Sequence, residues 1–204
     1  MKEVSCLVIC QPDWDQPFLI KPYKVLVPES QHGKPESDAE RVLNHVADVG
    51  YSDTVVTEFS DKLGKQLWDS VDWDDAEKVD STPQEPEDAL SLWRCLSGRG
   101  RSLDLEPIIA QDDHIAEVYS QSFEKSSWVN WTDEELVRNP CWLFMYAQQV
   151  MKGKLPENLH SAMIMHSFSS PENKYVKRYC RGRRYKYHCK KNLRPEVRFC
   201  VEAV

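Results

Sequence analysis

The sequence predicts an α+β protein with a small N-terminal α/β unit, an acidic linker and a mainly helical C-terminal unit. Short apolar, β-branched runs gather within the first 60 residues, whereas apolar residues at helical spacing dominate beyond residue 107. Between them, residues 69–88 hold nine acids, one lysine and two prolines, a composition typical of linkers and solvated loops. We therefore expect units at residues 1–68 and 107–204, joined by an acidic, flexible linker at 69–106. A chain of 204 residues is long enough for two small units of this kind.

Three strands are expected in the N-terminal unit. Residues 4–10 are short, apolar and β-branched, as in a buried strand. Residues 18–27 predict a second strand, in which Pro22 indicates an edge position or a break because proline has no N–H to donate. Residues 54–59 predict the third strand.

One helix is expected to cover these strands. Ser37 and Glu40 have the S-x-x-E spacing of a capping box, in which the two side chains satisfy backbone N–H groups at a helix start. Gly50 is a typical helix stop. A second, shorter helix is expected near residues 63–68.

Capping signals recur in the C-terminal unit, where most elements are expected to be helices. Thr132 and Glu135 form a second capping box, and Asn139 followed by Pro140 predicts a helix start with an N-cap and a proline at the first position. Further helices are expected over 90–96, 108–123, 140–152 and from Pro156, with a last strand over 197–201.

The segment 175–198 is charged opposite to the rest of the chain. It carries ten Lys/Arg and a single acid, Glu196, within a chain of net charge −7. Lysine and arginine neutralise phosphates, and tyrosine rings can stack on bases, so this segment is a candidate nucleic-acid surface. Its cations could instead pair with the acidic linker or with a partner protein. The candidate residues are Tyr175, Lys177, Arg178, Tyr179, Arg181, Arg183, Arg184, Tyr185, Lys186, Tyr187, Lys190 and Lys191.

A weak internal repeat bears on the conformation of this segment. Residues 146–154, YAQQVMKGK, resemble residues 175–183, YVKRYCRGR, at an offset of 29. If the repeat is real, the basic segment begins as a helix; otherwise the alternation over 185–190 favours a strand.

Two sets of residues in the sequence could be considered for a metal site, and we expect neither set to bind a metal. Cys180, His188, Cys189 and Cys200 lie close together but lack the tight pairs typical of zinc sites. A metal-dependent nuclease needs several carboxylates and a lysine. Glu172 and Lys174 have a suitable spacing, with Asp112 and Asp113 upstream, but ordinary surface charge explains them better.

Nucleophilic catalysis has no motif to carry it. The chain has no Gly-x-Ser-x-Gly and no glycine-rich phosphate loop. Seven cysteines, an odd number at scattered spacings, suggest reduced thiols. The first ten residues have too short an apolar run for a signal peptide, and no segment has the length of a membrane span. We expect a cytoplasmic protein with no membrane partner and no cofactor.

Three segments resemble the N-terminal, non-nuclease region of the phage and prophage exodeoxyribonuclease VIII family. They are PFLIKPYKVLV at 17–27, ESDAERVLNHVADVGYSDTVVTEFSDKL at 36–63 and WLFMYAQQVMKGKLPE at 142–157. The resemblance covers about half the chain and includes no catalytic motif. It implies a phage or prophage origin and a setting near recombination or anti-defence genes.

These observations favour a non-enzymatic phage or prophage accessory protein of the host cytoplasm, acting in DNA recombination or in interference with host defence. It would bind DNA, or a host protein that processes DNA or serves in defence, through residues 175–191. One alternative is a metal-dependent DNA exonuclease. The other is an inhibitor of a host protein in which residues 69–88 mimic nucleic acid.

Overall fold

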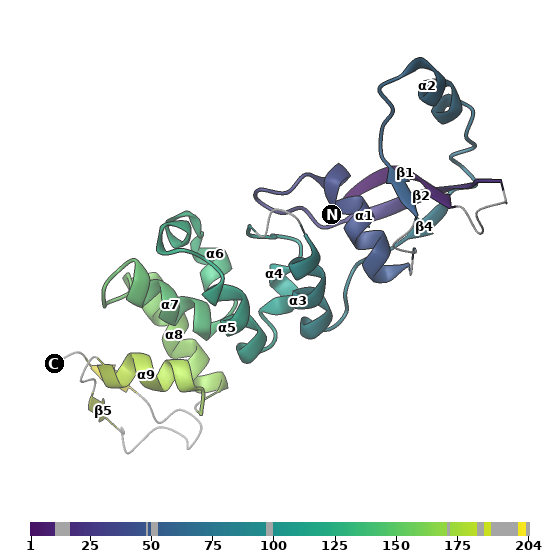
Figure 1. Ribbon diagram of the computed structural model, residues 1–204. Helices are drawn as coiled ribbons and strands as arrows, with labels where there is room; N and C mark the ends of the chain where they lie inside the picture. The colour runs from purple at the N-terminus through teal and green to yellow at the C-terminus, as the bar shows by residue number, and fades with distance from the viewer. Residues whose placement is uncertain are drawn as a thin grey trace. The chain divides into compact units, whose positions relative to one another are not determined.

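The computed structural model describes residues 1–10, 17–47, 49, 53–96, 100–170, 172–182, 186–188 and 200–202. The chain forms two compact units, Met1–Ile109 and Ala110–Val204. A four-stranded sheet lies in the first unit, and helices dominate the described part of the second (Figure 1). The predicted α+β class is therefore confirmed.

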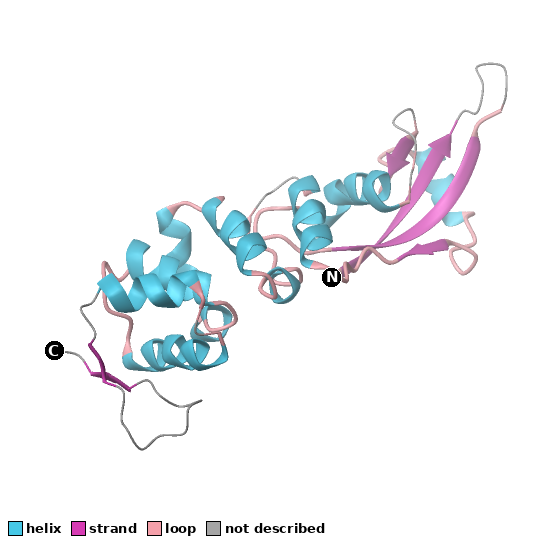
Figure 2. Cartoon of the chain, turned by 90° about the horizontal axis from the view of Figure 1, so that it is seen from below, coloured by secondary structure: helices cyan, strands magenta, loops and turns pink. Residues whose placement is uncertain are grey.

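The sheet is built around a long antiparallel pair, visible in Figure 2. Its strand order is β3-β1-β2-β4, with β3 antiparallel to β1 and β4 parallel to β2. All three predicted strands are present, and β4 is an addition. The bounds are β1 Lys2–Cys10, β2 Leu19–Val27, β3 Thr54–Val56 and β4 Glu77–Val79.

Pro22 lies in an inner strand, not at the edge of the sheet. It is opposite Leu7 of β1, and the parallel pairing with β4 covers only the three residues from Tyr23 to Val25. Proline is tolerated here because it directly precedes the stretch of β2 that pairs with β4.

Helix α1, Pro35–Val46, packs against β1 and β2 and buries Ala39, Val42 and Leu43. The predicted capping box does not form its start. Pro35 occupies the first turn, where a missing N–H costs nothing, and the N-cap is Lys34 without a side-chain hydrogen bond. The helix thus begins three residues earlier than predicted, with Ser37 inside its first turn.

The segment 69–106, expected to be a linker, is folded within the first unit. After β4 it forms α3, Pro86–Cys95, and α4, Glu106–Ile109. The acids of α3 lie on its exposed side, and its apolar residues, among them Leu92 and Trp93, are buried. The helix predicted over 90–96 is therefore present, and it begins four residues earlier, at Pro86.

A buried polar network closes the end of this segment. The indole Nε1 of Trp93 donates to the carbonyl of Gly100 at 2.9 Å. The guanidinium of Arg101 donates two hydrogen bonds to the carboxylate of Glu106, at 2.9 and 2.6 Å, and both side chains are buried. Paired in this way, the two charges can lie in the core.

The second unit begins with α5 and ends with a short antiparallel strand pair. Side chains are described as far as Cys180. The element bounds are α5 Asp113–Gln121, the 3-10 helix η1 Lys125–Asn130, α6 Asp133–Leu136, α7 Pro140–Gln149, α8 Glu157–Ser169, α9 Lys174–Gly182, β5 Lys186–His188 and β6 Cys200–Glu202.

Two predicted helix starts are confirmed in this unit. Thr132 and Glu135 form a complete capping box at α6, and the Asn139 side chain accepts from the N–H of Cys141 at 2.8 Å to cap α7. The helix predicted over 108–123 is instead two helices. Asp112 caps α5 through its side chain and so separates it from α4.

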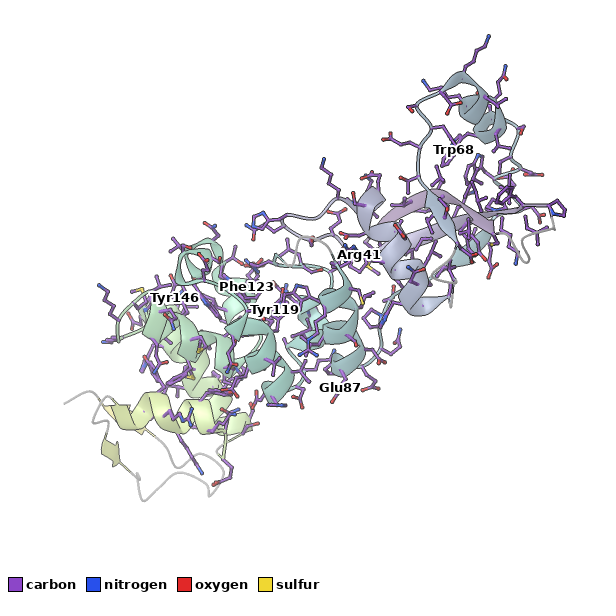
Figure 3. The ribbon with its side chains drawn as sticks, viewed as in Figure 1. Arg41, Trp68, Glu87, Tyr119, Phe123 and Tyr146 are labelled. Carbon is purple, nitrogen blue, oxygen red and sulfur yellow. The ribbon has the colours of Figure 1, made fainter. Side chains whose placement is uncertain are left out.

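Aromatic side chains fill the core of the second unit. The ring of Tyr119 on α5 and that of Phe123, two residues after its end, lie edge to face with centroids 4.8 Å apart; both are labelled in Figure 3. Trp128 stacks on Trp131 at 4.8 Å, and Trp131 meets the edge of Trp142 at 4.9 Å. Such pairs add to the apolar area that each ring buries.

Five cysteines in the described residues are free: Cys6, Cys10, Cys95, Cys141 and Cys180. In the helices that the structure describes, none is long and apolar enough to cross a bilayer.

Candidate functional site: a basic hollow between α7 and α9

Helix α9 has one apolar face and one basic face. Tyr175, Val176, Tyr179 and Cys180 are all less than 5% exposed, at the i, i+1, i+4, i+5 spacing of a buried stripe. This stripe packs on α7 and α8. The other positions carry the cations, and Arg178 is exposed.

A hollow of about 390 Å³ opens where α9 meets the end of α7. Phe144 and Ala147 give it an apolar wall, and two cationic residues, Lys152 and Arg178, are also part of its lining. Gln148, Gly153 and Tyr179 complete its lining.

The turn after α7 fixes the position of Lys152. Lys152 has a φ of 49° and Gly153 a φ of 146°, and the N–H of Gly153 donates to the carbonyl of Ala147 at 2.8 Å. A left-handed φ is uncommon for a residue with a side chain. The unfavourable backbone conformation therefore falls on Lys152, one of the two cationic residues that line the hollow.

Tyr179 is held by two polar contacts. The N–H of Leu155 donates to its hydroxyl at 3.3 Å, and the same hydroxyl is 3.0 Å from Nδ1 of His160. The imidazole and phenol rings lie 5.8 Å apart between centroids. Tyr179 therefore joins α9 to α8 and to the turn before it.

Tyr175 lies deeper, with its phenol buried beside Glu117 and Cys141. Burial, with the neighbouring carboxylate and thiol, raises the pKa of Tyr175 well above its ordinary value. Glu117 also accepts from Lys174 Nζ at 2.7 Å, and these contacts with Lys174 and Tyr175 lower the pKa of that carboxyl. Burial raises the pKa of Cys141 to about 11, so its thiol is not an activated nucleophile.

The structure divides the residues predicted from the basic segment. Tyr175 and Tyr179 belong to the core, so their rings are not presented for stacking on bases. Lys177 pairs with Glu172, and Arg178 lines the hollow. Arg181 lies in α9, and Lys186 and Tyr187 lie in β5. Arg183, Arg184, Tyr185, Lys190 and Lys191 lie outside the described residues.

The four residues considered for a nuclease have structural partners. Asp112 caps α5, and Asp113 accepts from Asn139 Nδ2 at 3.1 Å and from Asn173 Nδ2. Glu172 pairs with Lys177, as Lys174 does with Glu117. Within the described residues, no three His, Cys, Asp or Glu side chains gather closely enough to hold a metal ion.

The cysteine–histidine set considered for zinc is also spread over several elements. Cys180 is buried in α9, and the backbone register pairs His188 of β5 with Cys200 of β6. Cys189 lies outside the described residues.

The sequence analysis missed Lys152 and Gln148. Both belong to the segment 146–154 that resembles 175–183, so the internal repeat was the signal that could have found them. Both copies contribute lining residues to one hollow, with one cation from each.

No protein-family model, curated protein or solved structure matches the chain. The resemblance to the exodeoxyribonuclease VIII family stays a prediction.

Proposed function

We propose that this protein is a non-enzymatic DNA-binding protein, and that the hollow between α7 and α9 holds a backbone phosphate. The observation that supports this function is that Lys152 and Arg178 both line one open hollow. The basic segment that continues from α9 would follow the neighbouring phosphates. A role in phage recombination or in interference with host defence belongs to the same proposal, through the family resemblance.

The chemistry of the lining suits a phosphodiester. An arginine guanidinium donates to two phosphate oxygens at once, and a lysine ammonium adds a compact point charge. The amide of Gln148 offers further donors. The apolar wall formed by Phe144 and Ala147 can receive a sugar face, and the volume of the hollow lies in the range of small-ligand sites.

Helix α9 presents its cations at a low entropic cost. Four buried side chains hold the helix backbone, so Arg178 starts from a fixed base. Groups that are ordered before binding lose less freedom when the ligand arrives. The sequence alone suggested a charged segment, and the structure gives part of it a rigid support.

Salt dependence provides the test. Full-length protein is titrated into labelled duplex and single-stranded DNA, with fluorescence anisotropy read at several salt concentrations. Each phosphate contact contributes a slope of about 0.9 in log K against log salt for duplex DNA. Lys152 and Arg178 share one phosphate, so replacing both with Gln should lower the magnitude of the slope by about 0.9.

The control removes the same charge elsewhere. Arg94 and Arg138 are exposed and lie outside the hollow, so the double Gln variant at these positions should keep the wild-type slope. Equal loss in both variants would mean that only net charge matters. No binding by the wild-type protein at about 0.1 M salt, where the distant acids are screened, would overturn the proposed function.

A further inference from the structure

Helix α2, Lys62–Asp69, lies on a long excursion between β3 and β4 and stands clear of the sheet (Figure 1). Its own flanking residues hold it. The Asp61 carboxylate accepts from the N–H of Gly64 at 2.8 Å and caps the helix start. The ring of Phe59 lies directly against Gly64, where an added Cβ would come within 2.2 Å of it.

An aromatic trio packs on the same face of the helix as Gly64, because Trp68 lies one turn after that glycine. Trp68, labelled in Figure 3, meets Phe59 edge to face at 6.2 Å and Trp73 at 4.6 Å between centroids. The indole Nε1 of Trp73 also donates to the carbonyl of Trp68 at 3.3 Å. The excursion thus has a small core of its own, which leaves the outer face of α2 uncovered.

That outer face is apolar. Leu63 is 76% exposed, the most exposed large hydrophobic side chain in the described part of the chain, and Leu67 follows one helical turn later. An open hollow of about 550 Å³ lies between them and Phe59. Exposed leucine beside an apolar hollow forms a continuous apolar patch, the kind of surface that marks interaction sites.

The surroundings of the hollow indicate what covers it. Between residues 57 and 77 the chain has seven acids and two lysines. Among these acids, Asp61 precedes α2 and lines the hollow, Asp69 ends α2, and Asp72, Asp74 and Asp75 follow it, all five exposed. This excess of negative charge around the helix favours a positively charged partner.

We propose that the outer face of α2 is a docking site for a basic segment of another protein that carries a leucine-like anchor. The anchor would fill the hollow beside Leu63, and flanking lysines or arginines would face the acids around α2. Interfaces commonly combine a buried apolar anchor with a charged rim in this way. The site belongs to the first unit, and its test is separate from the proposed DNA binding.

The probe is a labelled amphipathic peptide of about 16 residues built from leucine and lysine, bound to the full-length protein and followed by anisotropy. Leu63→Ser should weaken its binding about tenfold, equivalent to about 1.4 kcal/mol. Leu103→Ser is the control, because Leu103 is 58% exposed in the same unit but outside the hollow. It should leave the affinity unchanged.

Charge is tested by a second pair of variants. Replacing Asp74 and Asp75 with Asn should weaken binding of the leucine–lysine peptide about threefold to tenfold at low salt. The control variant replaces Glu87 with Gln and Asp88 with Asn, which are exposed acids of α3. Its change in the logarithm of the binding constant should be less than half of that for the Asp74 and Asp75 variant.

Two further peptides test whether the binding partner of α2 needs both apolar and basic side chains. A serine–lysine peptide should bind at least tenfold more weakly, and a leucine–glutamate peptide should not bind. Equal binding of the serine–lysine peptide, failure of the leucine–lysine peptide to bind, or equal loss in Leu103→Ser would overturn the proposal. Self-association of the protein that Leu63→Ser abolishes would show that a second copy is the occupant, and would overturn it too.

Discussion

Replacing Tyr179 with Phe separates a structural role of this tyrosine from a direct role in binding bases. Phenylalanine keeps the ring and its packing but removes the hydroxyl. The N–H of Leu155 then loses its acceptor, and Leu155 is 1% exposed, so water cannot readily replace it. Leaving a buried N–H without a partner costs about 1–3 kcal/mol, and His160 loses its contact as well. We expect unfolding free energy to fall by about 1–3 kcal/mol.

Urea unfolding followed by far-UV circular dichroism measures this change. The midpoint should move to lower urea with the slope unchanged, because the surface exposed on unfolding is the same. Tyr146→Phe, on α7, is the matched control. Tyr146 is only partly buried, so its variant should stay within about 0.5 kcal/mol of the wild type.

The opposite outcome is equally clear. If Tyr179 served to stack on bases, phenylalanine would preserve that stacking, and both stability and DNA affinity would stay unchanged. A variant as stable as the wild type would refute the structural role argued for the hydroxyl.

Three further results are expected. Asn139→Ala should lower the unfolding free energy by about 2–4 kcal/mol in urea, because it removes the cap of α7 and two further hydrogen bonds. Burial raises the pKa of Cys6 and of Cys141 from 9.0 to about 11, so the native state retains their protons where the unfolded state loses them. The stability that the two thiols contribute should be complete below pH 9 and decline as pH rises toward 11. Urea unfolding at graded pH measures this decline. Gly64→Ala should displace the ring of Phe59 despite the better helix propensity of alanine, with faster amide exchange across α2 and no change in β1.

Local signals in the sequence predicted helix starts well where no neighbour competed. The Thr132–Glu135 box and the Asn139–Pro140 start involve residues a few positions apart, so the sequence contains the whole interaction. The same S-x-x-E pattern at Ser37 failed because a proline two residues earlier had already begun the helix.

Composition was a poorer guide than periodicity between residues 69 and 106. Nine acids over 69–88 suggested a solvated linker, and all nine are exposed, but only Glu87 and Asp88 lie in α3. The apolar residues Leu92 and Trp93, which follow the acidic run, place α3 in the core. The spacing of the apolar residues predicted this helix, whereas the charge count extended the linker too far along the chain.

The candidate site shows a different limit. The repeat suggested that the basic segment begins as a helix, which α9 confirms for its first turns. Which face of that helix is buried depends on its neighbours, and tyrosine suits both a core and a binding surface. Lys152 precedes Arg178 by 26 residues, so only the packing of α7 on α9 reveals that the two cations share a hollow.

The proposed binding of DNA to this surface requires that salt screen the acidic groups in the rest of the chain. Residues 175–198 hold ten cations and one acid, which leaves 16 cations against 32 acids in the rest. At physiological ionic strength charges are screened over about 8 Å, so a phosphate beside Arg178 interacts mainly with nearby cations. At about 0.01 M salt the reach is about 30 Å, and the remaining acids would repel the same phosphate. The slopes for the Lys152 and Arg178 variants should therefore be compared near 0.1–0.2 M salt, because repulsion at lower salt would mask the loss of a contact.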